Sequence, residues 1–232
     1  MSLNPFQRTQ LLLGDDSFHR LRAAHVAVVG CGAVGGFAVE ALARAGIGKL
    51  TLIDGDKAEE SNINRQLCAL HSTLNQYKTE ILKNRIWDIC PDTQVQTHPV
   101  FLTSANAEEL FADTPDFVID AIDILKDKIS LILFLQEKKI PFISAMGAAR
   151  KIDWRQIRIS PLNQTKTCPL AARLRKELKA QGADLSFPCV YSLEAPLDAQ
   201  APNRQMGSIV TITGAFGLII ANEVILRIAH HV

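Results

Sequence analysis

Hydrophobic positions along the chain alternate between short β-branched runs and longer stretches with helical spacing. Short apolar runs predict buried parallel strands at His25–Gly30, Lys49–Asp54, Phe117–Ala121 and Pro141–Ala145. Helical spacing predicts helices between them at Ala33–Ala45, Leu74–Ile89 and Leu125–Lys138. Strands that alternate with helices indicate parallel βαβ units, so the sequence predicts an α/β fold of the Rossmann type with a doubly wound, mostly parallel sheet.

The pattern differs at the two ends of the chain. Asn4–Leu21 mixes apolar and polar residues without a strand pattern, which favours a helix outside the main sheet. Further elements are expected as strands at Thr93–Val100, Gln156–Ser160 and Cys189–Glu194, helices at Leu170–Ala180 and Met206–Ala229, and a mobile loop at Pro196–Arg204. The fold should therefore end in a mixed C-terminal extension. A length of 232 residues suits one α/β domain, so we expect a single domain over 1–232.

Composition narrows the class of protein. Hydrophobic residues make up 47% and charged residues 21%, which is typical of a soluble globular chain. The formal net charge of +1 gives no overall attraction to nucleic acid, so any RNA contact must rest on a local patch. The five cysteines form no C-x-x-C pair, which favours reduced thiols in the cytosol over a four-cysteine zinc site.

The sequence gives no sign of export or of membrane insertion. The first residues lack a positively charged start followed by an apolar stretch, so we expect no secretion signal and a cytoplasmic location. The most apolar stretch, Gly207–Asn222, is ended by Glu223 and is shorter than the roughly 20 residues that span a bilayer. We interpret it as a buried helix that lies partly at a subunit interface, without membrane contact.

A glycine-rich turn predicts a nucleotide site. Gly30, Gly32 and Gly35 form a G-x-G-x-x-G directly after a predicted strand and at the start of a predicted helix. The glycines allow a tight turn and a close approach of backbone to phosphate, and the helix N-terminus supplies N–H groups. Asp54 ends the next strand, where an acidic side chain can bind ribose hydroxyls. The alternative is that the glycines serve only helix–strand packing.

The residues that follow favour a triphosphate over a nicotinamide dinucleotide. Asp54-Gly55-Asp56 leads into Ser61-Asn62-Ile63-Asn64-Arg65-Gln66, and Lys78 follows in the first turns of a helix. Two cations with amide side chains suit a phosphate chain. Asp123 comes just after a strand, at the carboxyl edge of the sheet, where it could hold Mg²⁺. The alternative for Arg65 and Lys78 is a pair of surface salt bridges.

These pieces together resemble the E1-like (ThiF/MoeB/HesA) adenylating enzymes, over nearly the whole chain. The resemblance implies that ATP is bound by Asp54 at the ribose, by Asn62, Arg65 and Lys78 at the phosphates, and by Asp123 through Mg²⁺. The matching motifs also include Asp56 and Gln66, which the resemblance implies help to bind the nucleotide, and the stretch Asp120-Ala121-Ile122-Asp123. Arg8 resembles an N-terminal arginine that reaches the ATP site of the neighbouring subunit, which implies a homodimer. Without the resemblance, Arg8 is an ordinary surface arginine.

Within that superfamily the chain is most similar to the tRNA threonylcarbamoyladenosine dehydratases. The similarity lies in Ala43–Gly48, Val118–Asp123, Pro169–Arg175 and Cys189–Glu194. It implies ATP-dependent dehydration of threonylcarbamoyladenosine at position 37 of tRNA, through an acyl-adenylate that the same modified side chain attacks to close a ring. Arg65, Lys78 and Mg²⁺ would neutralise charge at the α-phosphate. The stretch Gly147–Lys151 departs from the glycine-rich run expected there, which leaves the substrate side open.

Two features carry a functional and an ordinary interpretation. Cys189 resembles a family cysteine near a region that related enzymes use for thioester chemistry, but a buried structural thiol is common in a strand. The basic helix with Arg173, Arg175, Lys176 and Lys179 either contacts the tRNA backbone or is a solvated face.

Other functions remain open from the sequence. An adenylyltransferase that activates the C-terminal glycine of a ubiquitin-like sulfur carrier would share the ATP half of the site, although such enzymes commonly carry C-x-x-C zinc ligands. A sulfur-carrier protein or a cysteine desulfurase is accordingly a candidate partner. If the chain were an NAD-dependent oxidoreductase, its reaction would not require Arg65, Lys78 and Asp123. A non-catalytic scaffold would bind ATP and release no pyrophosphate.

Overall fold

The chain folds around one seven-stranded sheet. The computed structural model describes residues 4–197 and 206–230. The strand order is β3-β2-β1-β4-β5-β7-β6, and every neighbouring pair is parallel except β6 and β7, which are antiparallel. The strands are β1 His25–Val29, β2 Lys49–Ile53, β3 Gln94–His98, β4 Phe117–Asp120, β5 Phe142–Ala145, β6 Ile157–Pro161 and β7 Pro188–Ser192. The prediction of a doubly wound, mostly parallel sheet with a mixed C-terminal extension is confirmed.

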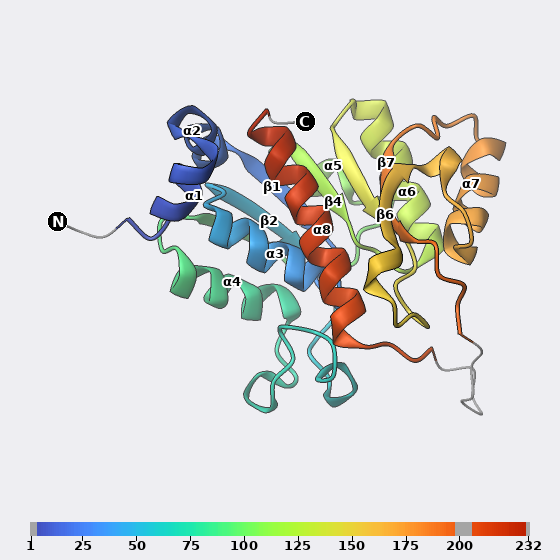
Figure 1. Cartoon of the computed structure of the whole chain (residues 1–232), viewed down its shortest axis with the longest axis horizontal. Helices are drawn as coiled ribbons and strands as arrows, with labels where there is room; N and C mark the ends of the chain where they lie inside the picture. The colour runs from blue at the N-terminus through green and yellow to red at the C-terminus, as the bar shows by residue number, and fades with distance from the viewer. Residues whose placement is uncertain (1–3, 198–205, 231–232) are drawn as a thin grey trace.

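Helices cover both faces of this sheet (Figure 1). The helices are α1 Gln7–Leu13, α2 Asp15–Ala23, α3 Gly35–Ala45, α4 Lys78–Ile89, α5 Ala107–Leu110, α6 Leu125–Lys138, α7 Pro169–Ala180 and α8 Val210–Ile228. Four 3₁₀ turns, η1 Glu60–Asn62, η2 His71–Thr73, η3 Trp154–Gln156 and η4 Leu162–Gln164, join them. The crossovers place helices on both sides, and the central strands are accordingly mostly apolar.

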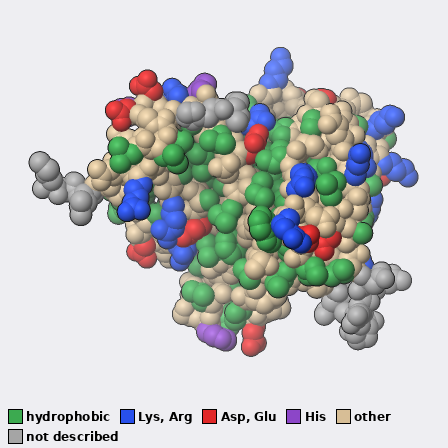
Figure 2. Space-filling model, viewed as in Figure 1, with side chains coloured by type: hydrophobic (Ala, Val, Ile, Leu, Met, Phe, Trp, Pro, Cys, Tyr) green, Lys and Arg blue, Asp and Glu red, His purple; other side chains and the backbone are tan. Residues whose placement is uncertain are grey.

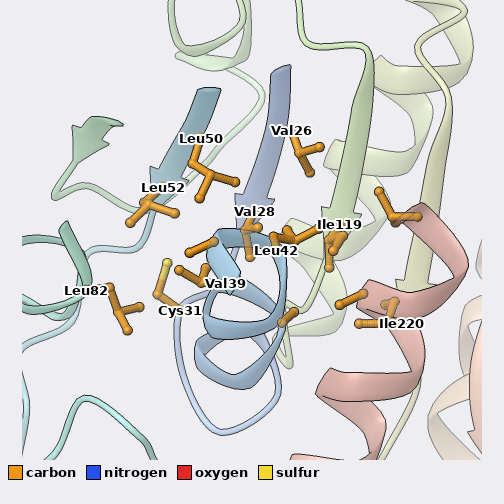
Figure 3. Packing of buried hydrophobic residues seen from close by; sticks show 14 of the residues in the cluster. Val26, Val28, Cys31, Val39, Leu42, Leu50, Leu52, Leu82, Ile119 and Ile220 are labelled. Atoms are coloured by element: carbon orange, nitrogen blue, oxygen red, sulfur yellow. The ribbon is translucent and has the colours of Figure 1, made fainter. Parts of the chain in front are cut away.

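Two hydrophobic clusters, one on each face, hold the layers together. On one face α3 and α8 pack over β1, β2 and β4, and Figure 3 shows Leu42 and Ile220 pointing toward Val28 and Ile119. On the other face α6 and α7 pack over β4, β5 and β7 through side chains that include Leu131. Each central strand therefore lies between two apolar layers, which rigidly fixes the strand ends that carry the polar residues described below.

The last helix crosses α3 closely. A Cβ atom on Gly217 would lie 2.4 Å from the carbonyl oxygen of Val34, so the glycine permits the contact. The inner face of α8 is buried, whereas Leu218 is 52% exposed on the outer face. Figure 2 shows hydrophobic side chains gathered along the middle of this view, over α8. By length and composition alone, the 19-residue helix is long and apolar enough to cross a membrane, longer than the uncharged stretch predicted from sequence.

Several element boundaries differ from the sequence predictions. The prediction of a single helix at the start of the chain is wrong, because Gly14 adopts a φ of 83° and separates α1 from α2. The helix predicted from Leu74 begins only at Lys78, since Tyr77 pairs with Lys57 in an isolated β-bridge and Asn75 has a φ of 65°.

Smaller differences affect the remaining elements. The last helix begins at Val210 rather than Met206, and the short helix α5 was not predicted. Strand β3 covers only Gln94–His98 of the predicted Thr93–Val100. Most of the predicted loop Pro196–Arg204 lies outside the described residues.

Candidate nucleotide site

The polar residues singled out from sequence meet at the carboxyl ends of β1, β2 and β4. The register pairs Val29 with Ile53 on one side and with Asp120 on the other. Gly30, Asp54 and Ala121, the residues that follow these three positions, therefore lie at the same edge of the sheet. This edge is where ligands bind in open parallel α/β sheets.

Two of the three motif glycines are required by packing. Gly30 has a φ of 90°, and a Cβ atom there would lie 2.7 Å from the Ala121 carbonyl oxygen. A Cβ atom on Gly35 would lie 1.8 Å from the Gly30 carbonyl oxygen. At Gly32, in contrast, the added atom would meet only the Gln66 side chain, at 3.7 Å. The turn thus packs tightly on its inner side and leaves room at Gly32.

The helix that follows the turn has a free N-terminus. Val34 is the N-cap residue of α3, and no side chain caps the helix there. The first-turn N–H groups of a helix lack partners within the helix and carry its positive dipole end. The turn and helix start therefore form a cradle that fits a phosphate group.

Asp54 ties the second strand to the glycine turn. Its Oδ2 accepts a hydrogen bond from the Cys31 N–H at 2.6 Å, and its Oδ1 accepts one from the Asp56 N–H at 2.8 Å. Burial raises the pKa of the Asp54 carboxyl, and the nearby Lys78 ammonium and the two N–H groups offset part of that effect. Each carboxylate oxygen keeps a further lone pair, so Asp54 can still accept hydrogen bonds from a ribose.

Lys78 places a nearly buried cation beside this carboxylate. It begins α4, its side chain is 5% exposed, and its Nζ lies 2.7 Å from Asp56 Oδ2. The Lys78 N–H also donates to the Asp56 carbonyl oxygen, so both backbone and side chain fix the lysine. An ammonium with one carboxylate partner at the mouth of the phosphate cradle is suited to a triphosphate.

The segment 60–66 carries amide and guanidinium groups, and its Gln66 side chain lies next to Gly32 of the glycine turn. Asn62 is buried, and its Oδ1 accepts a hydrogen bond from the Glu59 N–H at 3.3 Å. Arg65 Nη1 donates to the Ser61 carbonyl oxygen at 2.8 Å and to Asn64 Oδ1 at 2.9 Å. Among the described residues, Arg65 forms these two hydrogen bonds and no salt bridge with an acidic side chain, unlike the surface salt bridge considered from sequence. The guanidinium keeps further donors for an anion.

Asp123 lies in the turn between β4 and α6 and is exposed. Three residues earlier, Asp120 is fully buried and binds Lys128 and Ser144, a network that sequence reasoning missed. The signal available was a lysine on the face of α6 that otherwise carries the apolar residues Leu131, Ile132 and Leu135. Within the described residues, no three His, Cys, Asp or Glu side chains cluster as a metal site. A single carboxylate fits Mg²⁺ only when phosphate oxygens and water complete its shell.

Other predicted residues lie elsewhere. Cys189 is 0% exposed inside β7, and burial raises the pKa of its thiol. Arg8 is exposed on α1, which packs against α2 and lies away from the glycine turn in Figure 1. On α7, Arg173, Lys176 and Lys179 are exposed, whereas Arg175 donates to the Thr165 carbonyl oxygen at 3.0 Å. Figure 2 shows Lys and Arg side chains on the side of the molecule that carries α7.

Residues 6–231 match the ThiF family. The chain belongs to the ThiF family. This match covers the glycine turn, the segment 54–78, the β4 end and the C-terminal extension, so the assignment does not depend on one motif.

Several relatives of this chain share one name. It is 40% identical over 195 residues to the tRNA threonylcarbamoyladenosine dehydratase of Bacillus subtilis, which covers 84% of this chain and 77% of that protein. It is 34% identical to the Escherichia coli enzyme of the same name, over 96% of this chain and 92% of the other. A sulfur carrier protein adenylyltransferase of Thermus thermophilus is 32% identical, but over only 52% of this chain.

Solved structures agree with these relatives. The crystal structure of the E. coli tRNA N6-threonylcarbamoyladenosine dehydratase in complex with AMP has a TM-score of 0.92 and 35% identity, over 97% of this chain and 94% of the other. The same enzyme has been solved in complex with ATP, with a TM-score of 0.91. A relative with the same fold as this chain has therefore been solved with bound AMP and with bound ATP.

Proposed function

We propose that this protein dehydrates the threonylcarbamoyladenosine at position 37 of tRNA in an ATP-dependent reaction. The observation that carries the proposal is the phosphate cradle at Gly30–Gly35, with Asp54 hydrogen-bonded to it and Lys78 paired with Asp56 at the same sheet edge. The similarity to dehydratases over nearly the full length of both chains supports this substrate.

The proposed binding roles follow from the contacts. Gly30, Gly32 and Gly35 with the start of α3 hold phosphate oxygens, and Asp54 accepts hydrogen bonds from the ribose. Asn62, Arg65 and Lys78 contact the phosphate chain, and Gln66 and Asp56 keep the glycine turn and Lys78 in place. Asp123 supplies a carboxylate to Mg²⁺, which when bound neutralises phosphate charge.

The reaction needs no protein nucleophile. A carboxylate oxygen of the modified side chain attacks the α-phosphorus of ATP, the bond to the β-phosphate breaks, and pyrophosphate leaves. A nucleophile of the same side chain then attacks the acyl carbon, loses its proton and closes the ring. AMP leaves with the former carboxylate oxygen, so the net loss from the nucleoside is one water. Arg65 and Lys78 hold the α-phosphate in line and stabilise its developing charge.

The proposal extends to the assembly and to the tRNA. We expect a homodimer in which Arg8 of the partner subunit reaches the ATP site, and the exposed apolar face of α8 offers a surface for a second copy. Arg173, Lys176 and Lys179 on α7 are suited to backbone phosphates of the tRNA. A cytoplasmic location is consistent with free cysteines at all five positions.

The experiment is a turnover assay with ATP, Mg²⁺ and tRNA that carries threonylcarbamoyladenosine. We expect AMP and pyrophosphate in equal amounts, together with a nucleoside lighter by one water. Unmodified tRNA is the control and should release no AMP. Nucleotide turnover that ignores tRNA but responds to a ubiquitin-like sulfur carrier would replace this proposal with the adenylyltransferase, whose relative matches only half of the chain.

A further inference from the structure

A buried lysine lies at the ends of β4 and β5, in contact with the residue that precedes the Ala121–Ile124 turn of the proposed nucleotide site. Lys128, on the first turns of α6, is 0% exposed and is among the largest fully buried side chains of the described residues. Its Nζ donates to Asp120 Oδ2 at 2.7 Å and to Ser144 Oγ at 3.1 Å. Ser144 in turn donates to the same Asp120 oxygen at 2.6 Å. The three side chains close a triangle across the ends of β4 and β5.

Stabilisation of the folded protein does not by itself explain why these three polar side chains are buried together. Removing two charges from water is costly, and an apolar pair of similar volume often stabilises a core equally well or better. The surrounding residues of α6 that face the sheet, Leu131, Ile132 and Leu135, are all apolar. The ion pair occurs only where α6 passes the carboxyl edge of the sheet, which points to a requirement for geometry at that edge.

The network fixes the turn that carries Asp123. The second oxygen of Asp120, Oδ1, accepts a hydrogen bond from the Ile122 N–H at 3.1 Å. The Lys128 N–H donates to the Ile124 carbonyl oxygen at 3.0 Å. Both ends of the turn 121–124 are thus tied to the Asp120–Lys128 pair. Asp123 lies between them and is exposed.

The same turn contacts the phosphate cradle. The Ala121 N–H donates to the Val29 carbonyl oxygen at 2.8 Å, and the Ala121 carbonyl oxygen lies so near Gly30 that a Cβ atom there would be 2.7 Å away. A shift of the turn 121–124 would therefore change the position of the Asp123 carboxylate relative to the glycine turn.

We propose that Lys128, through Asp120 and Ser144, is a positioning residue that sets the distance between Asp123 and the phosphate cradle. This proposal rests on the proposed function, because it concerns the same ATP site. Lys128 does not touch the nucleotide. It acts on Mg²⁺-dependent binding, in the way that outer-sphere partners orient metal ligands in other sites.

The test compares ATP binding by Lys128→Met and by wild-type protein, with Mg²⁺ and with EDTA, by calorimetric titration. Methionine is an unbranched side chain close in length to lysine, and it removes the charge. We expect the Kd for MgATP to rise about 10- to 100-fold, while the Kd for ATP in EDTA changes far less. Leu131→Ala is the matched control: it removes a buried side chain one turn further along α6 and makes no bond to the turn 121–124. It should leave both Kd values unchanged.

The outcomes are distinguishable. Equal MgATP binding by folded Lys128→Met and wild-type protein would overturn the assignment, as would a loss of equal size with and without Mg²⁺. If Lys128→Met does not fold, Ser144→Ala decides, because it removes the two hydrogen bonds of the Ser144 hydroxyl, to Lys128 and to Asp120, and keeps the ion pair. This variant should weaken MgATP binding selectively, and unchanged binding would overturn the assignment. A wild-type protein that binds ATP in neither condition would instead overturn the proposed function itself.

Discussion

Gly35 lies so close to Gly30 that a Cβ atom on Gly35 would be 1.8 Å from the Gly30 carbonyl oxygen. The first turn of α3 therefore packs directly on the backbone that leaves β1. Gly32, between them in sequence, has ordinary contacts and faces the room where phosphate is expected.

This difference predicts opposite defects for two alanine substitutions. Gly35→Ala should destabilise the fold by at least about 3 kcal/mol, the upper end of overpacking penalties, because backbone cannot move aside easily. Gly32→Ala should unfold at nearly the same urea concentration as wild type and yet bind ATP more weakly, since the methyl group occupies space meant for phosphate. Urea denaturation and ATP titration of both variants provide the check. Equal stability of the two variants would contradict the packing argument.

Lys78→Met should lower kcat by about 10²-fold or more, the usual loss when one donor to a developing charge is removed. The matched control is Lys57→Met. The Lys57 ammonium lies 4.9 Å from the centre of the Tyr77 ring, whereas Asp56 pairs with Lys78. Rates of AMP release under saturating substrates should separate the two variants. A similar loss in both would show that general charge, rather than the position of Lys78, matters.

ATP binding should weaken in acid because of Asp54. Burial raises the pKa of this carboxyl above its ordinary value of 3.8, and only the ionised form accepts hydrogen bonds with both oxygens. Affinity should be constant at higher pH and fall as the pH drops through the raised pKa. The Asp54→Asn variant should bind weakly with less dependence on pH in that range. Titrations between neutral and acidic pH measure both.

The same shift affects stability with the opposite sense. The folded chain holds the Asp54 proton more tightly than the unfolded chain does, so this carboxyl favours folding most below pH 3.8 and loses that contribution as the pH rises through its folded pKa.

Cys189→Ala should keep turnover close to that of wild type. The thiol is fully buried, burial raises its pKa, and its nearest hydrogen-bond partner is the Phe187 carbonyl oxygen at 3.8 Å. Native protein should react slowly with a thiol reagent, and urea-unfolded protein should react at all five cysteines. Loss of AMP release in a folded Cys189→Ala protein would restore a chemical role for this residue.

Leu218→Glu should shift the protein from dimer to monomer if α8 carries the subunit interface. Leu218 is 52% exposed on an apolar helix face, and a carboxylate would have to be buried on assembly. Trp87→Glu, a change at an exposed apolar residue on α4, is the control. Sedimentation velocity distinguishes the two states. A dimer that survives Leu218→Glu would place the interface on another surface.

Local patterns allowed the sheet and the glycine turn to be predicted. Mostly apolar runs such as 25–30 and 117–121 identify buried strands, because a strand covered on both faces carries few polar positions, here His25 and Asp120. The order Gly30, Asp54, Lys78 and Asp123 indicated a nucleotide site. Gly30, Asp54 and Asp123 come after the carboxyl ends of parallel strands, which meet at one sheet edge, and Lys78 begins the helix that follows Asp54.

The predicted boundaries of elements are wrong where contacts with distant segments override the local preference for helix. Helix α4 begins four residues later than predicted because Tyr77 pairs with Lys57, a partner 20 positions earlier that no helical pattern reveals. The opening helix breaks at Gly14, and only α2 then buries Phe18 and Leu21 against the core.

The sequence by itself determined the Rossmann-type layers and the family, because periodicity and motif spacing are local properties. Only the tertiary structure decided which polar residues meet. Asp120, Lys128 and Ser144 come from β4, α6 and β5, and their contact depends on strand register and on how α6 packs across the sheet. It also placed the Cys189 thiol in the core, because β7 turns that side chain between apolar layers, and a sequence does not record on which side of a covered strand a thiol lies.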